Sequence, residues 1–111
     1  MERVVLGVIA GHPYWRSSAE GAERLAASVA ASAGGLDRRI AEAVQHWRLD
    51  RLGVVEQNIL RLGLYEMDSG GVPPKVAINE AVRLAHWFAG GRAPAFVNGV
   101  LDALARTAGL L

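Results

Sequence analysis

The sequence predicts an all-α protein, a helical bundle of about five helices in a single domain that spans residues 1–111. Apolar residues recur every three or four positions through most of the chain, and no stretch alternates apolar and polar residues as a strand would. Hydrophobic residues make up 51% of a chain rich in Ala and Leu, which favours helices. The length of 111 residues is sufficient for a hydrophobic core without disulfides or metals.

The first two helices are expected over residues 17–33 and 36–47. Ser17 and Glu20 have the spacing of a capping box, and Gly34 and Gly35 are expected to end the first helix. The second helix is indicated by apolar residues at helical spacing: Leu36, Ile40, Ala43, Val44 and Trp47.

Three more helices are expected over residues 53–68, 75–89 and 94–107. The helix over 53–68 is apolar around most of its circumference, so it is expected to lie at the centre of the bundle. Gly and Pro residues between 68 and 74 predict a turn, and Pro94 suits the first turn of the last helix. The apolar face of the helix over 75–89 is predicted to comprise Val76, Ala77, Ala81, Leu84, Ala85 and Phe88.

Three polar residues, Asn79, Glu80 and Asn98, interrupt the apolar helices near the C-terminus. Buried amides and carboxylates need hydrogen-bond partners, so we expect these side chains to bridge helices within the core. Gly99 is expected to permit the close approach of a neighbouring helix.

Composition and net charge exclude several classes of function. Twelve Lys and Arg against eleven Asp and Glu give a net charge of +1, so nucleic-acid binding requires a local basic patch. The apolar run at residues 4–11 is too short for a membrane span and lacks the flanks of a signal peptide, which favours a cytoplasmic protein without membrane contact. The absence of Cys, and the scattered positions of His12, His46 and His86, predict no metal, no cofactor and no enzymatic activity.

Five ordered motifs carry a resemblance to a known family: LDRRI, WRLDRLG, VEQNILRLGLYEM, PPKVAINEAVRLAHWF and FVNGVLDALA. Together they resemble the NusB family of bacterial transcription antitermination factors. The resemblance implies a NusB-like helical fold and a non-enzymatic protein that acts in the RNA polymerase antitermination complex. It also implies pairing with ribosomal protein NusE and binding of boxA-type RNA from ribosomal RNA operons.

The resemblance also suggests site residues. Asp50 and Glu56 occupy positions for contact with NusE, although an acid at a helix start is also explained by the helix dipole. The expected RNA-binding residues are Arg3, Arg16, Arg92, Phe96 and Asn98. Phe96 has the alternative of core packing, because it shares a helical register with Val100 and Leu104.

Residues 1–16 form a variable N-terminal segment that departs from the family's pattern. Family members usually begin with an arginine-rich helix, whereas Arg3 and Arg16 are the only bases before Ser17. A shortened N-terminal subdomain predicts weak RNA binding without NusE, and a homodimer in which residues 1–16 cover exposed apolar faces. The alternative is a truncated NusB-like RNA-binding or dimerisation module, as in the N-terminal domains of rRNA cytosine methyltransferases.

Overall fold

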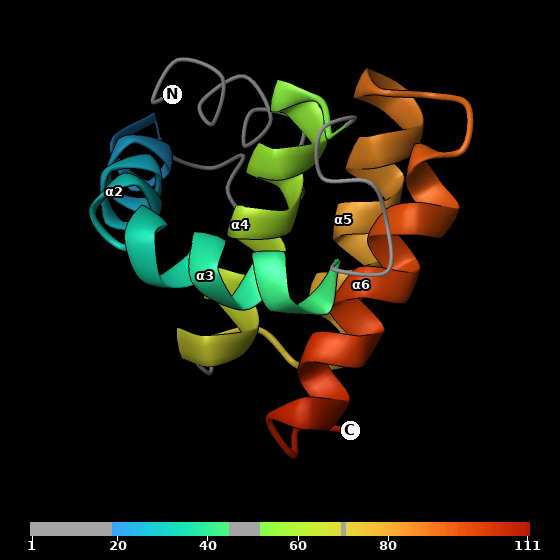
Figure 1. Cartoon of the computed structure of the whole chain (residues 1–111). Coiled ribbons are helices and arrows are strands. Elements are labelled where there is room, and N and C mark those ends of the chain that lie inside the picture. The colour runs from blue at the N-terminus through green and yellow to red at the C-terminus, as the bar shows by residue number, and fades with distance from the viewer. Residues whose placement is uncertain (1–18, 45–51, 70) are drawn as a thin grey trace.

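The computed structural model describes residues 19–44, 52–69 and 71–111, with side chains from Arg24 onward (Figure 1). These residues form five helices and no strand, which confirms the all-α prediction. The helices are α2 (Ala19–Ala31), α3 (Ala33–Ala43), α4 (Val54–Ser69), α5 (Pro74–Phe88) and α6 (Ala93–Thr107). Their bounds lie within a few residues of the predicted ones.

Helices α4, α5 and α6 lie side by side and alternate in direction, while α3 crosses them and α2 lies beyond α3 (Figure 1). α3 contacts both α4 and α6, and α2 contacts α3 and α4. Because neighbouring helices in the three-helix layer are antiparallel, α4 begins, α5 ends and α6 begins at the same end of the bundle.

α4 lies at the centre of the described structure, as the sequence predicts. Ile59, Leu60 and Leu64 have no exposed surface, and the buried face extends around most of the helix. The buried residues of α4 are Asn58, Ile59, Leu60, Arg61, Leu62, Gly63, Leu64, Glu66 and Met67.

Gly63 allows α5 and α6 to pack closely against α4. A Cβ atom added at Gly63 would lie 2.8 Å from Leu101 Cδ1 on α6 and 3.4 Å from Ala81 Cβ on α5. Gly99 has no such role, because it is exposed and an added Cβ would meet no atom of the described residues within 4 Å. The expectation that Gly99 permits a close helix approach is therefore wrong.

The break between the first two described helices falls at Ser32, whereas the sequence predicts it at Gly34 and Gly35. The Ser32 amide donates to both Ser28 O at 3.1 Å and Val29 O at 3.2 Å, which tightens the last turn of α2. Ser32 is also the N-cap residue of α3, although its side chain makes no capping hydrogen bond. Both glycines lie in the first turn of α3. The predicted capping box at Ser17 lies outside the described residues.

The turn from α5 to α6 depends on two glycines in the left-handed region. Gly90 and Gly91 have φ angles of 66° and 57°, a conformation that side chains with a Cβ rarely adopt. The Gly90 amide donates to Ala85 O at 2.8 Å, and the Ala93 amide donates to Gly90 O at 3.1 Å. This tight reversal brings the start of α6 next to the end of α5.

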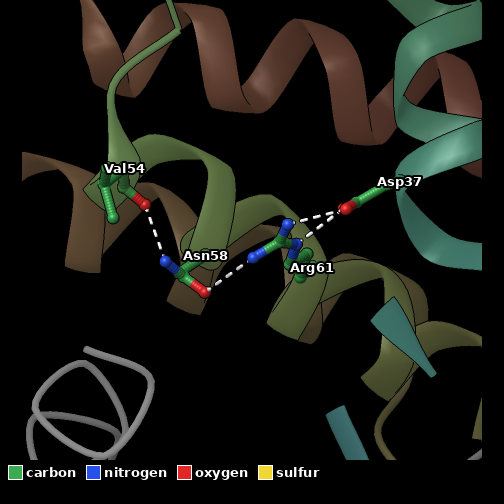
Figure 2. Close-up of polar contacts among 4 residues, drawn as sticks. All are labelled: Asp37, Val54, Asn58 and Arg61. Carbon is green, nitrogen blue, oxygen red and sulfur yellow. Dashed lines mark hydrogen bonds and ion pairs between the residues drawn. The ribbon is translucent and has the colours of Figure 1, made fainter. Parts of the chain in front are cut away.

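A buried arginine joins α3 to α4 (Figure 2). Arg61 is 9% exposed, and its Nε and Nη2 atoms each donate to a different carboxylate oxygen of Asp37 at 2.6 Å. Nη1 donates to Asn58 Oδ1 at 3.2 Å, and Asn58 Nδ2 donates to Val54 O at 2.8 Å. A buried guanidinium is tolerated only when it is paired, so this network fixes α3 against α4. A second, exposed ion pair joins Arg39 to Asp68.

Substitution of the central glycine should destabilise the fold. In Gly63→Ala, overpacking against Leu101 should cost about 1–3 kcal/mol, against a gain of about 0.5–1 kcal/mol from replacing a helical glycine. Gly99→Ala is the matched control and should stabilise by about 0.5–1 kcal/mol, since its site is open. Urea denaturation measures both changes, and equal stabilisation by the two variants would contradict the close packing at Gly63.

The two ion pairs between α3 and α4 should differ in their contribution to stability. Asp37→Ala leaves the Arg61 guanidinium largely buried without this partner and should cost about 1.5–3 kcal/mol. Asp68→Ala removes an exposed ion pair and should cost about 0–1 kcal/mol. Thermal and urea melts of both variants test this order, and a larger loss for Asp68→Ala would refute it.

Candidate functional site

One end of the bundle brings together several residues suited to binding. It is formed by the start of α4, the end of α5 and the start of α6 (Figure 1). We call this surface the bundle end and define it by Val54, Glu56, Trp87, Phe88, Arg92 and Phe96. Three of the predicted site residues, Glu56, Arg92 and Phe96, thus belong to one surface.

Glu56 lies in the first turn of α4 and is half-buried. Its carboxylate folds back over Gly53, since a Cβ atom added at Gly53 would overlap Glu56 Oε2. An acid in this position interacts favourably with the positive end of the helix dipole. The geometry supports the helix-start interpretation, and the exposed part of the side chain remains accessible to a partner.

Arg92 and Phe96 lie one turn apart at the start of α6. Arg92 is the N-cap residue and is exposed, which suits contact with a phosphate. Phe96 is half-buried and packs against the hydrophobic core. The ring of Phe96 therefore contributes to packing, as the alternative interpretation predicts, and keeps part of its surface accessible.

Asn79 and Asn98 do not lie in the core, so the expectation that they bridge buried helices is wrong. α5 turns Ala77, Ala81 and Leu84 toward the core, and Asn79 falls off that face. Both amides are exposed and line a groove of about 590 Å³ between α5 and α6. Its lining residues are Lys75, Ile78, Asn79, Asn98, Asp102, Arg106 and Leu111.

The expectation of a buried side chain that bridges two helices holds only in part for Glu80. Its side chain is half-buried, and its Oε2 atom is buried without a hydrogen-bond partner among the described residues. The structure therefore shows no polar bridge from Glu80 to another described helix.

One ion pair lies in the α5–α6 groove. Arg106 Nε donates to Asp102 Oδ2 at 2.8 Å. The hydrogen bond and the charge of Asp102 raise the pKa of Arg106. The lining of the groove therefore combines amides and charged groups with the apolar side chains of Ile78 and Leu111.

Sequence reasoning missed the exposed aromatic residues at the end of α5. Trp87 is 54% exposed and Phe88 48% exposed, although periodicity places Phe88 on the apolar face. The guanidinium carbon of Arg83 lies 5.8 Å from the centroid of a Trp87 ring. The i, i+4 spacing of Arg83 and Trp87, outside the apolar stripe, is the sequence signal that identifies this pair.

Three predicted site residues, Arg3, Arg16 and Asp50, lie outside the described residues, as do residues 1–16 with their expected role in a homodimer. In the described part of the chain, no group of three or more acidic, His or Cys side chains is arranged to hold a metal ion. No helix there combines the length and apolar character of a membrane span.

Comparisons with known proteins give consistent matches. The model of the NusB family matches residues 16–106. The transcription antitermination protein NusB of Solibacter usitatus is 49% identical over 71 residues, which is 64% of this chain and 49% of that protein. The protein of the same name from an Anaeromyxobacter species is 45% identical over 93 residues, covering 84% of this chain and 65% of that protein.

A solved structure of T. maritima NusB resembles the fold with a TM-score of 0.74 and 27% sequence identity. The superposition covers 95% of this chain and 87% of the T. maritima chain. In sequence, the chain spans about half the length of the first curated relatives it matches.

Proposed function

The chain belongs to the NusB family, and we propose that it is a transcription antitermination factor that pairs with ribosomal protein NusE and binds boxA-type RNA of ribosomal RNA operons. In this proposal it acts in the cytoplasm as part of an RNA polymerase antitermination complex. The observation that carries the proposal is the family match over residues 16–106, which runs from before α2 to the last turn of α6. The relatives from Solibacter usitatus and Anaeromyxobacter are both transcription antitermination proteins by name.

The start of α4 supports pairing with NusE. Glu56 is a half-buried acid, and Val54 in the same helical turn is 62% exposed. An acid and an exposed apolar side chain at one helix start suit a protein partner with a basic residue and an apolar contact. In the proposed complex, Glu56 keeps its position at the helix start and pairs with a base of NusE.

The start of α6 supports RNA binding. Arg92 is exposed and forms no ion pair with any described residue, so its charge is available to a phosphate. Asn98 lies further along α6 in the α5–α6 groove, and its exposed amide can both donate and accept hydrogen bonds at the edge of a base. Phe96 contributes its accessible surface to base stacking.

Charge reversal at the start of α4 should weaken binding to NusE. In Glu56→Lys, a positive charge would face the basic residue of NusE, and close interfacial charge pairs carry about 1.5 kcal/mol or more. The dissociation constant for NusE should therefore rise at least about tenfold. Titration calorimetry measures this change, with circular dichroism to confirm folding.

Glu42→Lys is the matched control for that experiment, because Glu42 is an exposed acid on α3, away from the bundle end. Its affinity for NusE should match that of the unsubstituted chain. Equal affinities of Glu56→Lys and Glu42→Lys for NusE would show that Glu56 does not contact NusE and acts only at the helix start.

Removal of the Arg92 charge should reduce the salt dependence of RNA binding. Each phosphate contact to single-stranded nucleic acid contributes about 0.7 to the slope of log K against log salt. Fluorescence anisotropy with a boxA-type RNA, in the presence of NusE, should give a smaller slope for Arg92→Gln and an unchanged slope for Arg38→Gln. Arg38 is an exposed arginine of α3. Identical slopes for both variants would remove Arg92 from the RNA interface.

A further inference from the structure

Exposed apolar side chains concentrate at the bundle end. The described residues expose five large hydrophobic side chains, and three of them, Val54, Trp87 and Phe88, lie there. The other two, Leu110 and Leu111, are the last residues of the chain. An indole that is 54% exposed leaves a large apolar face in water, which indicates a binding role for Trp87.

The indole of Trp87 makes a cation–π interaction with Arg83. The Arg83 guanidinium lies 5.8 Å from the ring centroid, within the range of a cation–π interaction. Since the two residues are one turn apart on the same helix, this contact restricts the rotamers of the indole before any ligand arrives.

The charges around the indole favour a polyanion. Arg83 and Arg92 are exposed and form no ion pair with any described residue. Glu80, the one acid of α5, is half-buried, and Asp102, the one acid of α6, is paired with Arg106. One guanidinium without a carboxylate partner in the described structure therefore lies over an exposed aromatic ring, and a second follows across the turn between α5 and α6.

We propose that Trp87 is a stacking platform for one base of a single-stranded RNA, with Arg83 orienting the indole and Arg92 contacting the adjacent phosphate. This inference rests on the proposed RNA-binding function and adds Trp87 and Arg83, to which the sequence analysis assigns no binding role. Single-stranded RNA fits better than a duplex, because its unstacked bases present free aromatic faces. The exposed ring next to these two cations distinguishes this surface from the acidic start of α4.

The test measures binding of a fluorescein-labelled, single-stranded boxA-type RNA by anisotropy, in the presence of saturating NusE. Trp87→Ala should weaken binding about 5- to 150-fold, the equivalent of ~1–3 kcal/mol for one stacked base. Trp87→Phe retains an aromatic face and should recover most of the affinity. Leu110→Ala, which removes an exposed apolar side chain elsewhere, is the matched control and should bind like the unsubstituted chain.

A second experiment measures the fluorescence of Trp87. With Trp15→Phe and Trp47→Phe as background substitutions, Trp87 is the only indole in the chain. A NusE chain free of Trp is used as the partner, and stacking should quench the fluorescence when single-stranded RNA is added. A duplex of the same sequence should leave it unchanged.

The outcomes separate this inference from the proposed function. Normal RNA affinity of Trp87→Ala, with no quenching, would overturn the stacking platform and leave the proposed function intact. Weaker NusE binding by Trp87→Ala, with unchanged RNA affinity in the saturated complex, would assign the surface to the protein partner and overturn the inference. If the unsubstituted chain with NusE binds no boxA-type RNA, both the inference and the RNA-binding part of the proposed function fail.

Discussion

The burial of α4 is the constraint on which the rest of the structure depends. A helix that is enclosed by α3, α5 and α6 must satisfy every polar group that it carries into the interior. Arg61 meets this requirement by a bidentate ion pair with Asp37 and a hydrogen bond to Asn58 (Figure 2). The pairing sets the position of α3, while Gly63 sets the distance to α5 and α6. One helix thereby fixes the packing of three others.

This packing determines which residues reach the surface together. Because α4, α5 and α6 alternate in direction, the start of α4 is brought to the same end as the turn between α5 and α6 (Figure 1). Gly90 and Gly91 make that turn short. A half-buried acid, Glu56, and an exposed cation, Arg92, therefore lie at one end of the bundle, with Arg83 one turn before Trp87 on α5. In the proposed complex, NusE meets the acidic side and RNA meets the basic, aromatic side.

Helical periodicity predicted the five helices and the central place of α4, because burial repeats with the helical period. The same signal could not place single residues at the margin of a buried face. The apolar neighbours of Asn98 and Gly99 suggest an interior position, yet both are exposed, and the close contact occurs at Gly63. That contact depends on a residue of α6 that is remote in sequence. The ion pair between α3 and α4 is equally non-local, and neither motif spacing nor composition indicated it. The spacing of Arg83 and Trp87 could have indicated their contact, whereas the exposure of the indole depends on the assembled bundle.

The central claim is that one end of the bundle carries both interactions, and amide chemical shifts of the isotopically labelled chain test it most directly. Addition of NusE should shift resonances in the first turn of α4. Subsequent addition of boxA-type RNA should shift resonances from the last turn of α5 to the first turn of α6. Amides of α3 that face away from this end should remain unchanged in both steps. Shifts centred on α2 and α3, with the bundle end unaffected, would contradict the claim.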